Sequence, residues 1–336
     1  MHFPKFFIII FTLHFLIIII SVCKSQDCAN PPTTILVDPT GNETFNTIQS
    51  AIDSVPLGNS QWIHIQISPG TYKEKVKIRS NKRCIYLEGA GRNCTSIEWD
   101  DHGHPHSSPT FTIAANNTIA KGISFKNTYN IIDESRNVVP AVAVRVHADK
   151  CAFIDCGFIG VQDTLFDSYG RHYYHNCYIQ GATDFIFGRG QSIFEASEIY
   201  FSVGLGPKRD GVITANERSS TDDPSAFVLK NCTINGIGGK TQLGRALELG
   251  HPRVIIANSF LADVIRPEGW GEKAPFIGHE AKITFEEVGC TGPGAKNTSR
   301  VPWINKLSTS ELNQFLNISF IDKEGWIIDL PLQIST

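Results

Sequence analysis

Two aspartates, Asp163 and Asp184, stand 21 residues apart in the stretch VQDTLFDSYGRHYYHNCYIQGATDFIFG, each beside apolar residues typical of strands. Two carboxylates in one partly desolvated cleft cannot both ionise cheaply, so one becomes protonated while the other stays charged. Such a pair supplies an acid together with an anionic base or nucleophile. The spacing alone fits equally well two aspartates that cap turns or strand ladders, so the neighbouring residues have to decide.

The residues around the aspartates favour a catalytic cleft. Gln162 could donate its amide N–H to a developing oxyanion. Three aromatic side chains could form an apolar floor for a sugar, namely Phe166, Phe185 and Phe187. Arg245, in QLGRALELG, could hold a carboxylate in a planar fork, although an isolated arginine is more often a surface charge.

The elements that must position these side chains are predicted to be strands. Runs rich in Val, Ile and Phe, separated by Gly, Pro, Asn or Asp, cover most of the chain. Helices are expected only near the ends, over Thr47 to Pro56 and after Ser308, which forms a capping-box pattern with Glu311. The fold class is therefore all-β.

A repeated pattern specifies which all-β fold is expected. Five strand segments align on a small residue, and the aligned positions are separated by 21, 20, 35 and 27 residues: Cys156, Cys177, Ser197, Cys232 and Ser259. A sandwich would space its strands at about 8 to 12 residues, whereas a coil of a parallel β-helix recurs in the low twenties. We therefore predict a parallel β-helix whose cysteines are buried, and whose adjacent coils bring Asp163 and Asp184 within about one strand spacing of ~4.8 Å.

The N-terminus predicts export. Residues 1–25 combine an early lysine with a long apolar run and small residues, as in a signal peptide, and the alternative is an uncleaved anchor. Residues 26–336 are expected to form one domain, secreted and glycosylated at some of six sequons. The net charge of −3 and the lack of a basic block argue against nucleic acid as a partner. After signal cleavage we expect no membrane association and a monomeric protein.

Two other patterns are interpreted as structural. The loop DDHGHPHSS (100–108) gathers carboxylates and imidazoles, but without a second ligand cluster we predict a solvated loop and no metal site. The segment EGAG (88–91) lacks the third glycine of a dinucleotide site and is predicted to be a turn.

Several motifs together resemble one family. They occur in this order: GTYKEKV (70–76), GISFKNT (122–128), QDTLF (162–166), DFIFG (184–188), GVITA (211–215), LGR (243–245), RPEGW (266–270) and CTGPGA (290–295). This order resembles the plant pectin methylesterases (pectinesterases), from about Val37 to Trp326. QDTL followed by DFIFG is highly specific to that family.

The resemblance implies a right-handed parallel β-helix and a carbohydrate esterase of the cell wall that converts methyl-esterified homogalacturonan into acidic pectin and methanol. It implies that Asp184 is the nucleophile, Asp163 the acid and then the base, Gln162 an oxyanion donor, and Arg245 the residue that orients Asp184. No metal or organic cofactor is implied, because these groups cover the acyl-transfer cycle.

Further features follow from the same resemblance. Trp270 is expected to contact the sugar together with the three phenylalanines, and a proteinaceous pectinesterase inhibitor is an expected partner. The inhibitor-like pro-region that many family members carry is expected to be absent.

The chain also departs from the family pattern. Pro140 stands where the family has a glutamine that donates to the oxyanion, and Leu247 stands where it has a sugar-stacking tryptophan. Ser197 replaces a family cysteine, which removes a disulfide partner for Cys232. An inactive or weakened pectin-binding protein is therefore the alternative to an esterase, and an error in the gene model between Ala246 and Pro252 is a further alternative.

Other β-helix enzymes of galacturonan are rivals. A calcium-dependent lyase would need clustered acidic ligands with a basic catalytic residue, and an inverting hydrolase would need carboxylates about 6.5 to 9.5 Å apart. Neither explains Gln162 beside Asp163 with DFIFG one coil later.

Overall fold

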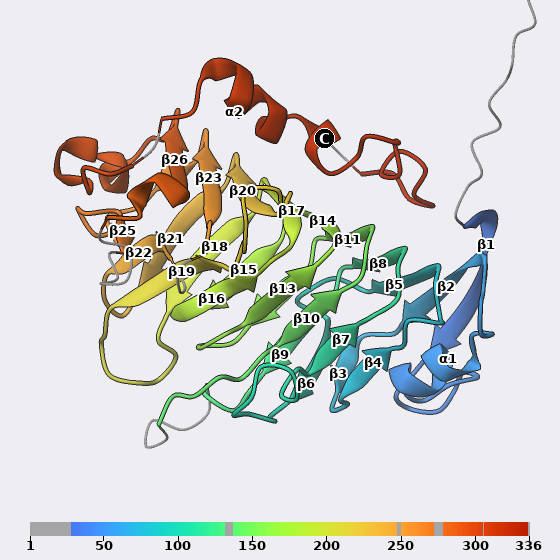
Figure 1. The fold of residues 1–336 in the computed structure, drawn as a ribbon. Helices are drawn as coiled ribbons and strands as arrows, with labels where there is room; N and C mark the ends of the chain where they lie inside the picture. The colour runs from blue at the N-terminus through green and yellow to red at the C-terminus, as the bar shows by residue number, and fades with distance from the viewer. Residues whose placement is uncertain (1–27, 132–136, 247–249, 272–277, 305, 335–336) are drawn as a thin grey trace, which may run out of the picture.

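Short strands pair in parallel with the strand one coil earlier or later along the chain. In the computed structural model, which describes residues 28–131, 137–246, 250–271, 278–304 and 306–334, the strands form three parallel sheets that wind around a common interior (Figure 1). One coil takes about 20 residues in the middle of the molecule, where Arg171 pairs with Gln191. The predicted parallel β-helix is confirmed.

Sheet A has ten strands within the described ranges. They are β1 (Ala29–Val37), β2 (Gln61–Ile67), β5 (Ile85–Gly89), β8 (Thr118–Lys121), β11 (Cys151–Ile154), β14 (Arg171–His175), β17 (Gln191–Glu195), β20 (Ala226–Lys230), β23 (Arg253–Ala257) and β26 (Thr284–Val288).

Sheets B and C have eight strands each in the same part of the chain. Sheet B contains β3 (Gly70–Tyr72), β6 (Thr95–Trp99), β9 (Ser124–Asn127), β12 (Gly157–Ile159), β15 (Tyr178–Gly181), β18 (Glu198–Ser202), β21 (Thr233–Ile237) and β24 (Phe260–Leu261). Sheet C contains β4 (Val76–Ile78), β7 (Phe111–Ile113), β10 (Val144–His147), β13 (Leu165–Tyr169), β16 (Thr183–Gly188), β19 (Gly211–Asn216), β22 (Thr241–Arg245) and β25 (Trp270–Gly271).

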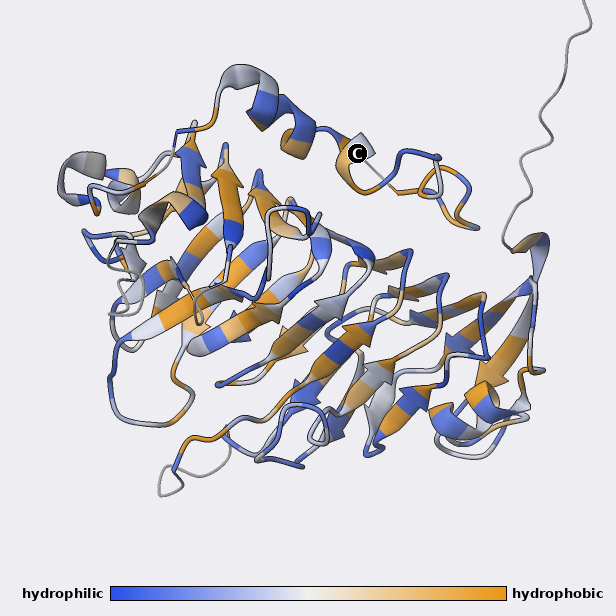
Figure 2. Ribbon diagram, in the orientation of Figure 1, coloured by the Kyte–Doolittle hydropathy of each residue, from blue (hydrophilic) through white to orange (hydrophobic). Residues whose placement is uncertain are grey.

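The interior is built from side chains that stack from coil to coil. Hydrophobic and hydrophilic residues alternate along many strands (Figure 2), as a period of two requires when one face is buried. Tyr174 stacks between Phe153 and Phe194, with ring centroids 4.9 and 4.5 Å away. This ladder buries a large aromatic area in three successive coils, and aromatic burial contributes strongly to the stabilisation of a core.

The predicted ladder of small residues also lies in the interior. Cys156, Cys177 and Cys232 are buried. The backbone N–H of Cys177 donates to Ser197 Oγ, and that of Cys232 donates to Ser259 Oγ, each at 3.0 Å. Burial raises the pKa of the Cys156 and Cys232 thiols to about 12. These cysteines are therefore unreactive packing residues, as predicted.

Both predicted helices are present. Helix α1 (Ile48–Ser54) begins at the N-cap Thr47 and buries Ile48, Ala51 and Ile52. Helix α2 (Thr309–Leu316) begins with the predicted capping box of Ser308 and Glu311. Four 3-10 helices occur in the described C-terminal part: η2 (Glu280–Lys282), η3 (Pro293–Ala295), η4 (Asn297–Ser299) and η5 (Ile318–Phe320).

The C-terminal segment covers the outer face of sheet A. In Figure 1 it runs, in red, from β26 back along the strand ends of this sheet. Ile321, Trp326 and Leu330 are buried there against residues of sheet A such as Tyr173 and Ile255. Sheet A is therefore covered on its outer side by the C-terminal segment.

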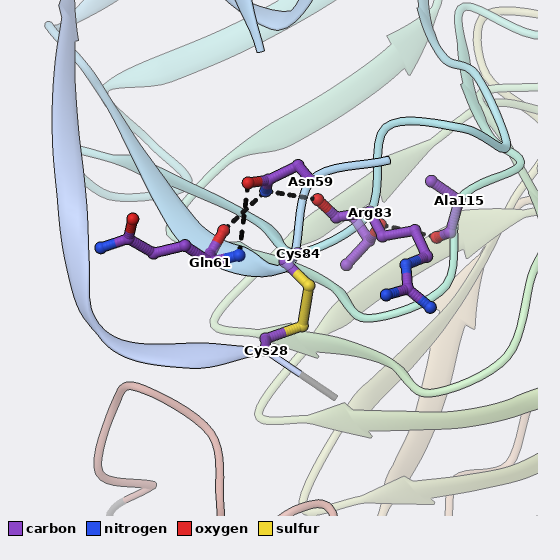
Figure 3. Close-up of a disulfide and its surroundings, with 7 residues drawn as sticks. Cys28, Asn59, Gln61, Arg83, Cys84 and Ala115 are labelled. Atoms are coloured by element: carbon purple, nitrogen blue, oxygen red, sulfur yellow. Dashed lines mark hydrogen bonds between the residues drawn. A yellow bond between two sulfur atoms is a disulfide. The ribbon is translucent and has the colours of Figure 1, made fainter. Parts of the chain in front are cut away.

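One disulfide ties the first coils together. Cys28, next to β1, bonds to Cys84, next to β5 (Figure 3). Beside it, Asn59 Nδ2 donates to the carbonyls of Gln61 and Arg83 at 2.6 and 2.9 Å. The disulfide joins positions 56 residues apart. Closing a loop of this length restricts the unfolded chain and stabilises the fold by about 2–4 kcal/mol. Cysteine spacing did not predict this pairing.

None of the helices in the described ranges is long and apolar enough to cross a membrane. The predicted signal peptide, residues 1–25, lies outside the described residues.

Candidate active site

The two aspartates sit at backbone kinks in neighbouring strands of sheet C. Asp163 just before β13 and Asp184 in β16 both have left-handed backbone conformations, with φ of 62° and 48°. Aspartate tolerates this conformation better than most residues. The register of β16 against β19 shifts between Thr183 and Ile186, so Asp184 lies in a β-bulge. The backbone N–H of Asp163 donates to the Thr183 carbonyl at 3.0 Å, which places the aspartates at equivalent positions one coil apart.

Arg245 holds Asp184 in a planar fork. Its Nε donates to Asp184 Oδ1 at 2.6 Å, and its Nη2 donates to Asp184 Oδ2. Arg245 ends β22, two strands away from β16 in sheet C. A bidentate arginine fixes the plane of the carboxylate and stabilises its negative charge. The structure therefore brings together two residues that are 61 positions apart in the sequence.

Asp163 occupies a different electrostatic environment from Asp184. Both side chains lie mostly under the surface, since each residue is 8% exposed. Burial and, to a smaller extent, the charge of Asp184 together raise the pKa of Asp163 to about 7, although Arg245 opposes the shift. A carboxylate held by arginine thus lies beside a carboxyl group that stays mostly protonated below about pH 7. This is the arrangement needed for one nucleophile and one acid.

Gln162 and two phenylalanines border the pair. Gln162 is partly exposed and forms a parallel bridge with Thr183. Phe166 and Phe187 stack on each other, with centroids 4.4 Å apart, on the outer face of sheet C. They form an apolar platform near the carboxylates, and the contact of Phe166 and Phe187 with a sugar stays a prediction.

Two of the predicted substrate contacts are buried instead. Phe185 is fully buried in the core, because the bulge at Asp184 turns the following side chain inward. Trp270 is also fully buried: its ring stacks on Phe285 at 4.4 Å, and its indole N–H donates to Glu287 at 2.9 Å. The structure corrects both assignments, since neither side chain reaches the surface.

Of the two departures from the family pattern, the structure describes Pro140 but not Leu247. Pro140 lies at the same edge of sheet C as the aspartates, because the next residue, Ala141, donates its N–H to the Gln162 carbonyl at 3.2 Å. A proline offers no donor at this position. Leu247 lies outside the described residues.

The sequence did not point to an open cavity of about 810 Å³ on the same face. Its lining includes His106, Arg145, His147, Arg189 and Glu217. Arg145 and His147 alternate with buried valines on β10, so the period-two pattern of VRVH could have marked them as outward-facing.

The histidine loop packs against the protein more closely than predicted. His102 stacks on Tyr129 at 3.5 Å, and the His106 ring meets the Phe166 ring edge-on at 5.2 Å. Within the described residues, no three His, Cys, Asp or Glu side chains cluster as metal ligands. The loop contributes His106 to the lining of the cavity.

The fold and these side chains place the chain among the parallel β-helix enzymes that carry their site on one outer sheet. Comparison with known proteins gives the family. The model of the Pectinesterase family matches residues 34–324, and the chain belongs to this family.

Individual proteins agree with this assignment. "Probable pectinesterase 55" of Arabidopsis thaliana is 45% identical over 90% of this chain and 92% of its own length. "Probable pectinesterase 29" of the same plant is 46% identical over 89% of this chain and 90% of its own length. The pectin methylesterase from carrot superposes with a TM-score of 0.84 at 25% identity, over 91% of this chain and 98% of the carrot chain. The pectin methylesterase of Aspergillus niger superposes with a TM-score of 0.75 at 26% identity, over 90% of this chain and 98% of its own. The fold is the right-handed parallel β-helix of these esterases.

Proposed function

We propose that this protein hydrolyses the methyl esters of homogalacturonan in the plant cell wall, releasing methanol and leaving acidic pectin. The family and the names of its relatives support this reaction and substrate. The observation that carries the mechanism is the Arg245 fork on Asp184 beside the protonated Asp163.

In the first step, a carboxylate oxygen of Asp184 attacks the carbonyl carbon of the ester. The carbonyl oxygen gains negative charge, which the Gln162 amide N–H stabilises. Asp163 then gives its proton to the leaving methoxide, so methanol departs and the acyl group remains on Asp184 as an anhydride. Asp163 is left as a carboxylate.

In the second step, the Asp163 carboxylate removes a proton from water, and the resulting hydroxide attacks the acyl carbon. The bond to Asp184 breaks, which restores its carboxylate in the Arg245 fork and the proton on Asp163. Phe166 and Phe187 supply an apolar surface for the sugar ring next to the reacting ester. Every proton is returned, so the cycle needs no other reactant than water.

The test is methanol release from highly methylated pectin. The protein without residues 1–25 is expected to release methanol, and its Asp184→Ala variant is expected to release none above background. Equal rates for the two proteins would rule out this esterase mechanism. Export can be tested separately, because the predicted signal peptide should direct a fused fluorescent protein to the apoplast.

A further inference from the structure

A second open cavity lies beside the one at the candidate site, where the chain passes from sheet C to sheet A. It has a volume of about 730 Å³ and is lined by residues from successive coils, including Asn116, Tyr169 and Gln191. It shares His147 and Arg189 with the first cavity. Its size falls within the range of cavities that hold small ligands.

Asn116 can carry a sugar at the edge of this cavity. Asn116, Asn117 and Thr118 form an N-x-T sequon, and Asn116 is exposed. Its Oδ1 accepts a hydrogen bond from the backbone N–H of Asp149 at 2.9 Å, while its Nδ2 donates no hydrogen bond to any described residue. An N-linked glycan is attached at Nδ2 and leaves Oδ1 as an acceptor. Glycosylation therefore preserves the bond that orients the Asn116 side chain.

Tyr169 presents an aromatic surface in the same cavity. It is 59% exposed, which leaves much of a large ring open to solvent. The Tyr169 carbonyl accepts from the N–H of Ala148, the residue just before Asp149. Asn116 and Tyr169 are therefore two coils apart, about 10 Å at the spacing of neighbouring strands. The ring of His147 extends this surface, with its centroid 5.8 Å from that of Tyr169.

The charges around this cavity suit a neutral sugar. Among the lining residues, Asp149 and Asp223 balance Arg171 and Arg189. Asp149 and Arg171 also bind each other, with Arg171 Nε 2.9 Å from Asp149 Oδ1. Burial, together with nearby cations, lowers the pKa of His147, so its ring is neutral at neutral pH. A lining without net charge favours an uncharged sugar such as N-acetylglucosamine over an acidic polymer.

We infer that Asn116 carries an N-linked glycan whose first N-acetylglucosamine packs against Tyr169 in this cavity. During export, an oligosaccharyl group is transferred from a lipid pyrophosphate to Asn116 Nδ2. A C–N bond forms, the amide loses one proton, and the lipid pyrophosphate leaves. The C–H groups on one face of the sugar then pack on the Tyr169 ring. This inference does not depend on the esterase reaction.

The sequon at Asn231 offers an internal comparison. Asn231 is exposed and is followed by Thr233 two residues later. Its equivalents in the adjacent coils are Ala196 and Asn258, which have no aromatic ring. A glycan at Asn231 is therefore expected to extend into solvent.

Occupancy is the first test. The full chain is secreted from yeast, and its glycopeptides are identified by mass spectrometry. Thr118→Ser keeps the sequon and should keep the glycan at Asn116, whereas Thr118→Val has a similar shape and should remove it. Neither variant changes the Asn116 side chain. An unoccupied Asn116 in secreted wild-type protein would overturn the inference.

Release of the glycan by a peptide N-glycosidase tests its packing. The enzyme must reach the bond between Asn116 and the first sugar, so a packed sugar slows release from the native protein. Tyr169→Ala should speed native release from Asn116 about tenfold, the effect of removing roughly 1.4 kcal/mol of packing. Tyr169→Phe keeps the ring and should behave as wild type does. Release from Asn231, or from any other occupied sequon, should not change.

Two controls separate packing from folding. Melting temperatures of the Tyr169 variants should agree with wild type within a few degrees, and release from the unfolded proteins should be equally fast. Native release from Asn116 that is the same in Tyr169→Ala and wild type would contradict the packing. An equal acceleration at the other occupied sequons would contradict it as well, because it would show a general loosening of the fold.

Discussion

Asp163 and Asp167 stand four residues apart at one strand, yet their surroundings differ completely. Asp163 is 8% exposed, and its neighbour one coil later is a second carboxylate, Asp184. Asp167 points into the β-helix, is 0% exposed, and pairs with the fully buried His172. The same coil thus carries Asp163, which has no cation of its own, and Asp167, which is paired with His172.

His172 carries a positive charge in this arrangement. Its Nδ1 faces Asp167 Oδ1, and its Nε2 lies 2.7 Å from the Ala148 carbonyl oxygen. When Asp167 is ionised, both partners accept hydrogen bonds, so both ring nitrogens donate and the ring is in the imidazolium form. Burial opposes this charge, but Asp167 and the Ala148 carbonyl outweigh it and raise the pKa of His172.

The comparison shows how the same residue type is used for structure and for chemistry. The Asp167–His172 pair is compensated, so it fixes the interior and has no reason to exchange protons. Asp163 is uncompensated, and the resulting electrostatic cost holds its proton near neutral pH. We therefore expect Asp163 to lower the free energy of unfolding and the Asp167–His172 pair not to lower it.

The largest expected effect is on catalysis at the cleft. Asp163→Asn removes the acid and should lower kcat for methanol release on the order of a thousandfold. The measurement is methanol from a fully methylated oligogalacturonate at saturating concentration. A loss of less than about tenfold would show that another group protonates the leaving methanol.

The second effect is on folding at the buried pair. His172→Leu leaves Asp167 buried without its cation and should lower the free energy of unfolding by about 3–5 kcal/mol in urea titrations. The matched control replaces both residues by leucine, which removes the charges together and should recover part of the loss. A single variant that unfolds like wild type would argue against an ion pair.

The third effect is a gain in the free energy of unfolding when Asp163 is replaced. The pKa of Asp163 is raised above its ordinary value, so between about pH 4 and 7 the folded state binds more protons than the unfolded chain, and stability falls as pH rises. Asp163→Asn removes this cost and should stabilise the fold by about 1–3 kcal/mol at pH 8. At pH 4 the gain should disappear. A variant destabilised at pH 8 would contradict the assignment of Asp163 as an uncompensated acid.

The smallest expected effect is a gain of activity. Pro140→Gln together with Leu247→Trp restores a donor and an aromatic platform expected from the family and should raise kcat/KM by up to about tenfold. Each single variant shows which group matters. Unchanged turnover in all three would mean that neither departure limits the reaction.

Coil spacing made much of this structure predictable. The 21- and 20-residue intervals from Cys156 to Cys177 and on to Ser197 identified the β-helix, and with it the placement of Asp163 and Asp184 in adjacent coils. The assignment of Phe185 failed because the bulge at Asp184 sends two successive side chains, Phe185 and Ile186, inward, whereas simple alternation assumes one.

Other features depend on contacts that spacing does not encode. Trp270 follows a glycine in RPEGW, and only its packing on Phe285 shows that it is internal. Arg145 and Arg189 are ordinary cations in the sequence, and only the three-dimensional structure shows that both line one cavity together with Phe166. The Cys28–Cys84 pairing likewise depends on how β1 and β5 meet.

The pH dependence of kcat/KM for a fully methylated oligogalacturonate tests the division of roles between the aspartates most directly. Such a substrate has no titrating carboxyl groups, so the profile between pH 5 and 8 reports on the free enzyme. Because Asp163 must be protonated and its pKa is raised to about 7, kcat/KM should fall above pH 7 toward tenfold per unit, and the residual rate of Asp163→Asn should not. A wild-type rate that stays level or rises from pH 6 to 8 would contradict Asp163 as the acid beside an Asp184 nucleophile.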